Sequence, residues 1–304
     1  MTSWLDLNFS IQPEVIQALR ENKPIVALES TVITHGLPHP QNINLAHDME
    51  SEIRNLGCVP ATIAVLDGKV CVGLDDVQLE RLAIGENMLK VSGRDFANAI
   101  AMGKSGGTTV AGTLLAAHAA GIRVFATGGI GGVHRQAPYD VSADLMQLAQ
   151  NPLVVVCAGA KAILDLPATL EVLETNGVPV IGYQTDEFPA FYSISSGFPV
   201  SARADTPEEV VAIASAHWGM GMASSVLVAV PPPKETALKP EMVENVIQIA
   251  LNEAQENHIH GQEVTPYLLS RVRELTGGSS LKANLALLRN NARVAAQIAY
   301  SFNK

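Results

Sequence analysis

The 304-residue sequence has few aromatic residues, few cysteines and no long uninterrupted apolar run. Aromatic residues make up only 5% of the chain, so the core has to be built from aliphatic side chains. No apolar run approaches the ~18 residues that a membrane span requires, and the first residues lack the basic and apolar pattern of a signal peptide. We therefore expect neither a membrane span nor export.

The three cysteines, Cys58, Cys71 and Cys157, are widely spaced and stand in apolar surroundings. Their odd number and wide spacing argue against a disulfide framework and against a CxxC metal site. A reducing compartment, the cytoplasm, suits them best.

A cluster of positive charge is also missing. The chain has 20 basic and 30 acidic residues, for a formal net charge of −10, and no segment concentrates lysine and arginine. This argues against a nucleic-acid partner, because such surfaces neutralise phosphates with clustered cations. If the substrate is an anion, the site has to supply a local positive field of its own.

Short apolar runs rich in β-branched residues recur along the chain, and helical patterns separate them. This alternation predicts βαβ units, and therefore an α/β fold with a largely parallel central sheet. The predicted strands are residues 25–28, 62–66, 124–127, 153–157, 178–183 and 226–230. The predicted helices include residues 112–121, 170–177, 240–257 and 280–299, the last of them amphipathic and packed on the sheet or on a neighbouring subunit.

The triple proline at residues 231–233 is the strongest interruption of this pattern. Three prolines cannot continue a strand, and a predicted strand and a predicted helix flank them closely. A turn is therefore favoured over a domain boundary, and we expect a single domain over residues 1–304.

Polar residues directly follow several predicted strands. Glu29 follows the first strand, the glycine-rich residues 128–132 and then His134 follow the third, and Lys161 follows the fourth in the stretch VVVCAGAK. The carboxyl ends of parallel strands open onto the ligand crevice of an α/β sheet. Glu29, the glycine-rich stretch and Lys161 are therefore expected to converge.

Both charged residues have two interpretations. Lys161 is either a solvated loop lysine or, because its neighbours are small and apolar, an amine whose lowered pKa lets it form a Schiff base. Glu29 either caps the next element or acts as a general acid, its pKa raised by desolvation.

Two glycine-rich stretches match nucleotide-binding motifs only in part. GKS at residues 103–105 follows a helical pattern, and Asn98 stands where a P-loop has its first glycine. In GGIGGVH, His134 stands where the dinucleotide fingerprint has its third glycine. We expect both stretches to be loops, either structural turns or anion sites with exposed N–H groups, and a helix to open at Thr108 and Thr109.

Two carboxylates, Asp140 and Asp144, flank Ser142, which is predicted to cap a helix. Asp144 either complements the helix dipole while Asp140 ends the loop, or the pair helps to bind a hard divalent cation together with water. His35 and His39 lie in a segment broken by proline and glycine, so they cannot form a helical HxxxH ligand pair.

Seven unusual segments follow one another over nearly the whole chain. They are ALESTVITHGLPHPQN (27–42), GKSGGTTVAGT (103–113), VFATGGIGGVHR (124–135), DVSADL (140–145), VVCAGAKAILDL (155–166), GYQTDEFPAFY (182–192) and ELTGGSSLKANLALLRNNA (274–292). Together these segments resemble the pseudouridine-5'-phosphate glycosidases. The resemblance implies an α/β/α layered core, a homotrimer, and reversible cleavage of the carbon–carbon glycosidic bond of pseudouridine 5'-phosphate to uracil and ribose 5-phosphate.

The resemblance also implies roles for individual residues. Glu29 would be the proton donor that opens the sugar ring, and Lys161 the nucleophile that forms an imine with the sugar. One Mn²⁺ per subunit would bind at Asp140. The implied substrate-binding residues are Lys90, Val110, Ser142, Ala143 and Asp144, with His134 and Asn284 as further candidates.

Two other functions remain open from the residues. A Schiff-base aldolase or lyase acting on a different phosphorylated sugar would use the same lysine, and a non-catalytic nucleotide-binding module would use the glycine-rich stretches.

Gly93 and Gly106 stand at positions where we expect other residues to be allowed.

Overall fold

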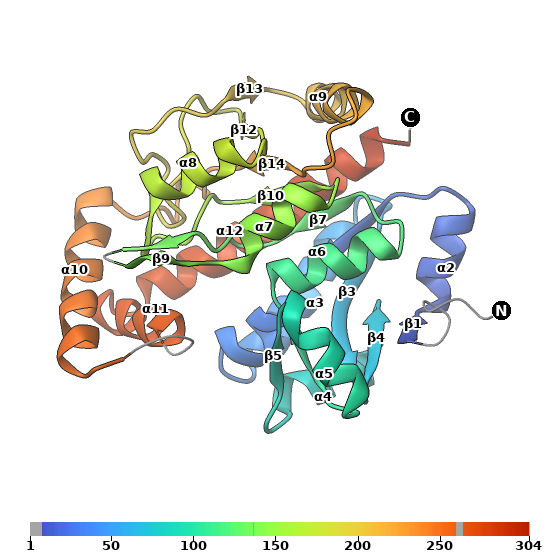
Figure 1. The fold of residues 1–304 in the computed structure, drawn as a ribbon, viewed down its shortest axis with the longest axis horizontal. Coiled ribbons are helices and arrows are strands. Elements are labelled where there is room, and N and C mark those ends of the chain that lie inside the picture. The colour runs from blue at the N-terminus through green and yellow to red at the C-terminus, as the bar shows by residue number, and fades with distance from the viewer. Residues whose placement is uncertain (1–7, 136, 260–263, 304) are drawn as a thin grey trace.

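The computed structural model describes residues 8–135, 137–259 and 264–303. Its centre is a sheet of eleven strands (Figure 1). Nine of them follow one another across the sheet in the order β1 (Phe9–Ile11), β4 (Lys69–Val72), β3 (Val59–Leu66), β2 (Ile25–Leu28), β7 (Val124–Ala126), β10 (Val154–Cys157), β14 (Val226–Ala229), β12 (Val180–Tyr183) and β13 (Ala202–Ala204). The other two are β6 (Gly106–Thr108), which pairs with β3, and β5 (Leu89–Val91), which pairs with β6.

All pairings from β3 to β13 are parallel, which confirms the predicted α/β fold. The six predicted strands are all present, and their ends differ from the predicted ends by three residues at most. The largest difference is at β3, which was predicted to begin at residue 62 but begins at Val59, with Pro60 paired to Val26 of β2. A proline lacks a donor for the ladder, so the pattern placed the beginning of this strand too late.

Helices cover both faces of the sheet, which confirms the α/β/α layers. In Figure 1, α6 (Val110–Ala119), α7 (Ala143–Gln150) and α8 (Leu166–Thr175) lie in front of the sheet. Behind it, α12 (Ser279–Ser301) crosses β2, β7 and β10 and packs on α3 (Gln41–Arg54) and α9 (Pro207–Gly219). The remaining helices are α2 (Pro13–Arg20), α4 (Asp76–Ile84), α5 (Phe96–Ala101), α10 (Pro240–Glu256), α11 (Val264–Leu275), the π-helix Val32–Gly36 and the short 3₁₀ helix Gly93–Asp95.

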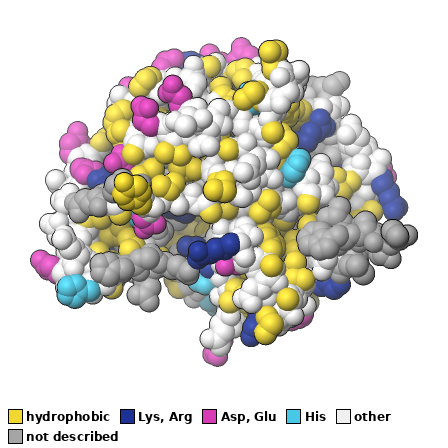
Figure 2. Space-filling view, in the orientation of Figure 1, with side chains coloured by type: hydrophobic (Ala, Val, Ile, Leu, Met, Phe, Trp, Pro, Cys, Tyr) yellow, Lys and Arg dark blue, Asp and Glu magenta, His cyan; other side chains and the backbone are white. Residues whose placement is uncertain are grey.

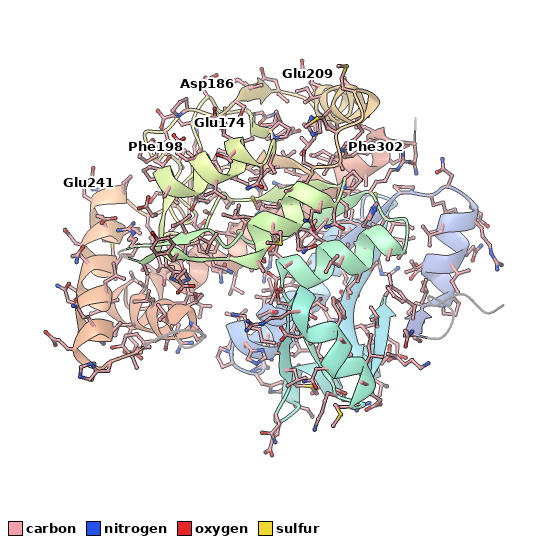
Figure 3. The ribbon with its side chains drawn as sticks, in the orientation of Figure 1. Glu174, Asp186, Phe198, Glu209, Glu241 and Phe302 are labelled. Carbon is pink, nitrogen blue, oxygen red and sulfur yellow. The ribbon has the colours of Figure 1, made fainter. Side chains whose placement is uncertain are left out.

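The buried side of α12 explains why this helix lies on the sheet of its own chain. Six of its buried residues are alanines or a serine, whose small side chains allow the helix to approach the strands closely, and Leu287, Leu288 and Ile298 fill the remaining space. At its C-terminal end, Phe302 stacks on Trp218 of α9, with ring centroids 6.1 Å apart (Figure 3).

A second, smaller sheet lies beside the carboxyl ends of the main strands. It consists of β11 (Leu164–Asp165), β8 (Val133–His134) and β9 (Ala137–Val141), all antiparallel. The triple proline is followed by a turn, in which Pro233 O accepts from Thr236 N and Ala237 N, as predicted. Beyond it, α10 and α11 pack together at one end of the molecule (Figure 1).

All three cysteines are free and buried, as expected for residues that form no disulfide. On the face shown in Figure 2, lysine and arginine side chains lie scattered among acidic and apolar ones. No helix in the described part of the chain combines the length and the apolar character needed to cross a membrane.

Candidate active site

The ends of β2, β7 and β10 lie level with one another in the centre of the sheet. Ala126 of β7 pairs with Leu28 of β2 on one side and with Val156 of β10 on the other. The segments that carry Glu29, the glycine-rich stretch and Lys161 therefore leave the sheet at the same edge, as predicted from the strand ends.

Glu29 lies half-buried at this edge and shares a hydrogen bond with the next strand. Thr127 Oγ1 donates to Glu29 Oε1 at 2.8 Å. Burial raises the pKa of Glu29; the Lys161 ammonium, the Thr127 hydroxyl and the Val32 N–H oppose this rise, and the Asp144 carboxylate adds to it. The net effect is a raised pKa, which is the direction expected from the sequence and the direction that a general acid requires.

Thr127 and Asn291 were not identified from the sequence. Asn291 is fully buried on α12, and its Nδ2 donates to Thr127 O at 2.8 Å, so it holds the residue that bonds Glu29. Its Oδ1 is the one buried side-chain polar atom of the described residues without a hydrogen-bond partner. Thr127 directly follows β7 just as Glu29 follows β2, but the prediction counted Thr127 as part of the strand. Asn291 could have been found as a polar residue on the apolar side of an amphipathic helix.

Lys161 lies on a loop that is bonded to the glycine-rich stretch through the backbone. Lys161 N donates to Ile130 O at 3.1 Å, and Ile130 N donates to Gly159 O at 3.1 Å. The Lys161 ammonium acts electrostatically on Glu29, Lys90 and His134, and its side chain is partly exposed. The structure therefore brings the predicted acid and the predicted nucleophile into one site.

The N–H groups of the glycine-rich stretch are partly occupied by Asp144, which is 6% exposed. Its two carboxylate oxygens accept from Gly131 N at 2.7 Å and from Ala111 N at 2.9 Å. A Cβ added at Gly131 would lie 2.2 Å from Ser142 Oγ, so the backbone needs glycine there to approach α7. This arrangement leaves no place for a pyrophosphate on Gly131 and argues against the nucleotide-binding module.

Two helix N-termini meet beside this carboxylate. Ser142 caps α7, with its Oγ accepting from Asp144 N, and Thr109 caps α6, with its Oγ1 accepting from Gly112 N, as predicted for both helices. Asp144 lies in the first turn of α7 and also bonds the first turn of α6. The structure thus confirms the interpretation of Asp144 as a partner of the helix dipole and adds a second helix to it.

The other glycine-rich stretch is a loop at residues 103–105, as predicted, but the residues that follow form a strand, which corrects the rest of the prediction. Gly106–Thr108 forms β6, and its backbone pairs with β3 and β5. A Cβ at Gly106 would lie 2.2 Å from Leu89 O, so the expectation that another residue is allowed there is also wrong. At Gly93 the nearest atom would be 3.1 Å away, on the flexible side chain of Leu115. The strand was missed because Gly106 and Gly107 lack the apolar, β-branched side chains by which a strand is recognised.

Three further basic groups surround Glu29 and Lys161. Burial lowers the pKa of Lys90 on β5, and the Lys161 ammonium lowers it further. Burial also lowers the pKa of His134; the Lys161 and Lys90 ammonium groups lower it further, and the Asp140 carboxylate opposes this shift. The pKa of His35 is lowered by burial and by the Lys90 ammonium. The two ammonium groups, Lys90 and Lys161, give the site the local positive field that an anionic substrate needs, whereas the lowered pKa of the two imidazoles favours their neutral form.

The structure places the other residues predicted near the site on separate elements. His39 pairs with Glu80 on α4 at 3.4 Å, and it forms no helical pair with His35, as expected. Val110 is buried at the start of α6, and Ala143 is exposed at the start of α7. Asn284 is partly buried on α12, two turns before Asn291 and on the same side of the helix.

Asp140 is exposed on β9, and its carboxylate acts on His134. Over the described ranges, no group of three His, Cys, Asp or Glu side chains could hold a metal ion. A single exposed carboxylate suits a hard divalent cation that keeps most of its water, as Mg²⁺ and Mn²⁺ commonly do. Asp140 thus fits a hydrated ion better than a fully protein-bound one.

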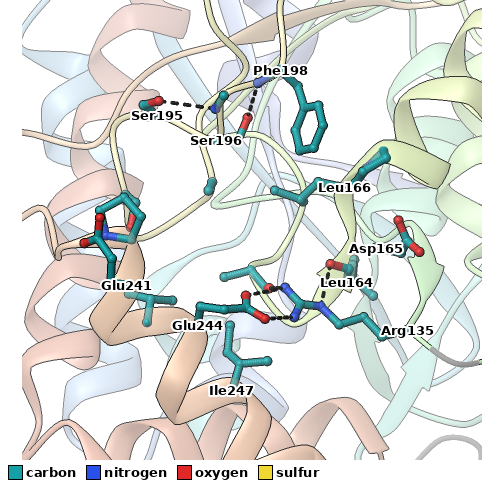
Figure 4. Close-up of a pocket in the computed structure, with 17 residues that line it drawn as sticks. Arg135, Leu164, Asp165, Leu166, Ser195, Ser196, Phe198, Glu241, Glu244 and Ile247 are labelled. Carbon is teal, nitrogen blue, oxygen red and sulfur yellow. Dashed lines mark hydrogen bonds and ion pairs between the residues drawn. The ribbon is translucent and has the colours of Figure 1, made fainter.

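A cavity of about 820 Å³ borders the Lys161 loop from outside the site (Figure 4). Ala162 and Leu164 line it together with residues of α10 and of the segment 193–198, whereas Glu29 and Lys161 do not. The candidate active site is therefore the strand-end cluster, and this cavity is a separate feature.

The fold and the cluster define an α/β/α enzyme class with a protonatable carboxyl group and an amine at the carboxyl ends of parallel strands on either side of one central strand. Residues 14–301 match the family model described as "Indigoidine synthase A like protein". The chain is 54% identical to the pseudouridine-5'-phosphate glycosidase of Geobacillus kaustophilus over 94% of its length and 96% of that protein's. It is 52% identical to the enzyme of the same name from Solibacter usitatus, over 96% of its length and 99% of that protein's.

Two solved structures have nearly the same fold as this chain. The prealnumycin C-glycosynthase AlnA, in complex with ribulose 5-phosphate, superposes with a TM-score of 0.91 at 40% identity over 98% of both chains. An indigoidine synthase A-like protein from Thermotoga maritima gives 0.90 at 36% identity, over 98% of this chain and 97% of that one. The chain belongs to the pseudouridine-5'-phosphate glycosidase family, which confirms the resemblance drawn from its motifs.

Proposed function

We propose that the chain cleaves, reversibly, the carbon–carbon glycosidic bond of pseudouridine 5'-phosphate to uracil and ribose 5-phosphate. The observation that carries this proposal is that Glu29, with its raised pKa, and Lys161, which acts on it electrostatically, follow β2 and β10, the two strands that flank β7. The names of the relatives and of the C-glycosynthase support the same chemistry. A carbon leaving group cannot be released by protonating a heteroatom in the leaving group, so two carboxylates alone would not be sufficient.

In the proposed mechanism Glu29 donates a proton to the ribose ring oxygen, and the sugar ring opens. The Lys161 amine then attacks the exposed anomeric carbon and forms a covalent adduct. The bond to uracil breaks, the uracil carbon takes a proton, and the nitrogen lone pair forms an imine with ribose 5-phosphate. Water hydrolyses the imine, which releases the sugar and restores the lysine.

The substrate's phosphate is proposed to bind between Lys90 and the N-termini of α6 and α7. The positive ends of the two helix dipoles favour an anion here, and Lys90 adds a full charge; the N–H groups of Ala111, Gly112 and Asp144 already donate to Asp144 and to the two caps. Substrate contacts are assigned to Lys90, Val110, Ser142, Ala143 and Asp144, and His134 and Asn284 are assigned to positioning the sugar or the base.

Asp140 is proposed to hold one Mn²⁺ per subunit. A bound divalent cation would supply positive charge that stabilises anionic oxygens of the substrate. We expect chelation to abolish activity and readdition of Mn²⁺ to restore it, and Asp140→Asn to raise the Mn²⁺ concentration needed for half-maximal activity. Full activity after complete removal of divalent ions would show that Asp140 has no metal-binding role.

The lysine mechanism is tested by trapping the imine. Incubation with ribose 5-phosphate and borohydride is expected to add one sugar phosphate to Lys161, located by peptide mass spectrometry. Lys161→Ala is expected to form no adduct and to lower kcat by more than about a thousandfold, because no other group replaces the nucleophile. Lys234, on the turn after the triple proline, offers a control: Lys234→Ala is expected to form the adduct as wild type does. Near-normal turnover by Lys161→Ala would rule out the mechanism.

A lyase acting on a different phosphorylated sugar is the second candidate, and the ribulose 5-phosphate bound to the C-glycosynthase favours it. Both candidates would give the borohydride adduct. Only the first predicts that uracil and ribose 5-phosphate together yield pseudouridine 5'-phosphate, so this reverse synthesis distinguishes them.

A further inference from the structure

Arg135 follows the candidate site residue His134 directly, and its side chain bonds the loop that carries Lys161. Its Nε donates to Leu164 O at 3.1 Å and its Nη2 donates to Ala162 O at 3.1 Å (Figure 4). Both carbonyl groups lie within three residues of Lys161. The guanidinium thus connects the β8–β9 hairpin to the segment just beyond the proposed nucleophile.

The same guanidinium is held from its other side by α10. Arg135 Nη1 lies 2.6 Å from Glu244 Oε1, and Nη2 lies 3.0 Å from Glu244 Oε2. This two-point pairing uses the planar geometry of arginine, which a lysine cannot reproduce. The Arg135 side chain is 22% exposed, so most of it is withdrawn from competing water.

The Lys161 loop has a specific need for this support. Its inner side is bonded to the glycine-rich stretch, through Lys161 N and Ile130 O, but its outer side borders the cavity of about 820 Å³. Side-chain packing is therefore incomplete on the outer side, where Ala162 and Leu164 line the cavity. Hydrogen bonds from Arg135 hold the loop where packed atoms would otherwise do so.

We propose that Arg135 is a positioning residue for Lys161: anchored by Glu244, it fixes the loop so that the amine stays aligned with Glu29 and the anomeric carbon. This inference rests on the proposed function, since it assigns Lys161 the role of nucleophile. Misplacement of a reacting group by about 1 Å costs about a hundredfold in rate. Removing Arg135 is expected to slow the chemical step and to leave substrate binding nearly unchanged.

The test compares Arg135→Met with wild type in two measurements. The first is the steady-state kcat and KM, and the second is the rate of borohydride-trapped adduct formation on Lys161 at saturating ribose 5-phosphate. We expect kcat and the trapping rate to fall together by about 10- to 100-fold, with KM within about threefold of the wild-type value. If Arg135 only stabilised the fold, its loss would lower the yield of folded enzyme and leave these rates per folded molecule unchanged.

Arg271→Met is the matched control. Arg271 forms the same two-point ion pair with α10, through Glu253, but comes from α11 and does not contact the Lys161 loop. Its loss should weaken the α10–α11 packing and leave kcat and the trapping rate at wild-type values. Equal losses of rate in both variants would overturn the inference, because general loosening of α10 would then be the cause.

Two further outcomes separate this inference from the proposed function. If wild type forms no adduct, the imine mechanism fails and the inference fails with it. If wild type forms the adduct and folded Arg135→Met forms it equally fast, only the inference is overturned. Should Arg135→Met not fold, Arg135→Lys decides: one ammonium cannot reach both carbonyl groups and Glu244 in the observed geometry, so a wild-type rate in that variant would also overturn it.

Discussion

In the proposed reaction Glu29 is the proton donor, and the groups around it determine its pKa. Burial raises its pKa, while the Lys161 ammonium and the Thr127 hydroxyl stabilise the ionised form and limit the rise. A general acid works best when its pKa lies near the working pH, where it is still protonated and still gives up its proton readily. We therefore expect the contact with Thr127 to influence the pH range of activity.

Thr127→Val is expected to move the alkaline limb of the kcat/KM profile to higher pH. The substitution removes a donor to the Glu29 carboxylate, so the pKa of Glu29 rises further and the acid stays protonated to a higher pH. A hydrogen bond to a charged group contributes roughly 1.5–3 kcal/mol, which corresponds to a shift of about one to two pH units. Thr127→Ser keeps the hydroxyl group and should keep the wild-type profile; identical limbs for the valine and serine variants would contradict the assignment.

Some of these residue roles were accessible from the sequence. Glu29 and Lys161 stand directly after strongly apolar runs, and this position alone indicated a crevice. Thr127, Asn291 and Arg135 were not found, because each acts through a contact with a residue distant in the chain, such as the 98 positions between Thr127 and Glu29.

The glycine-rich stretch after β7 is the element that joins the parts of the site. Its backbone bonds the Lys161 loop through Ile130 and bonds α7 through Gly131 and the Asp144 carboxylate. Glycine at position 131 allows this approach, since a Cβ there would lie 2.2 Å from Ser142 Oγ and 2.8 Å from Asp144 Oδ2. The stretch therefore works as a close packing surface for α7.

Gly131→Ala is expected to lower both stability and activity. The new methyl group would push Ser142 and Asp144 away, at a cost of about 1–3 kcal/mol in the free energy of unfolding, and would displace the cap of α7. Urea unfolding and kcat/KM measure the two effects. Gly219→Ala, at the end of α9 where a Cβ meets nothing within 4 Å, is the matched control and should change neither. Wild-type unfolding of Gly131→Ala would show that α7 can move aside at no cost.

Elements were predicted well where burial leaves a long pattern and poorly where it does not. All six central strands and the helices α6, α8, α10 and α12 were identified, because a buried strand or an amphipathic helix records its surroundings in its apolar residues. The strands β1, β4, β5 and β13 are only partly buried and β6 begins with two glycines, so none of them shows a continuous apolar run of four residues, and they were missed. For β6, glycines needed for close strand contact were interpreted as a loop.

Exposed apolar side chains lie close to the metal candidate, Asp140, along the chain. Tyr139 is 99% exposed, Val141 42% and Met146 60%, and they lie on β9 and α7 on either side of Asp140 in the chain. Adjacent exposed apolar groups of this size often mark a protein interface. They support the homotrimer proposed from the family resemblance.

Sedimentation equilibrium is expected to give three times the mass of one chain over a wide concentration range. Dilution well below the working concentration of the enzyme should leave this value unchanged if burial of the apolar groups stabilises the assembly. A species of one chain throughout the range would contradict the trimer, and it would leave the strand-end site, which one chain forms from its own residues, unaffected.

The sequence by itself determined the α/β fold, the positions of Glu29 and Lys161 at strand ends, and the family, because these depend on local apolar patterns and on motifs of contiguous residues. Only the tertiary structure decided that β7 lies between β2 and β10, so that Thr127 bonds Glu29. It also decided that Asp144 joins two helices to the glycine-rich stretch and that Arg135 bonds the Lys161 loop. The physical reason is that strand order and side-chain contacts are set by packing between distant segments. Such contacts leave no periodic trace in the residues that make them.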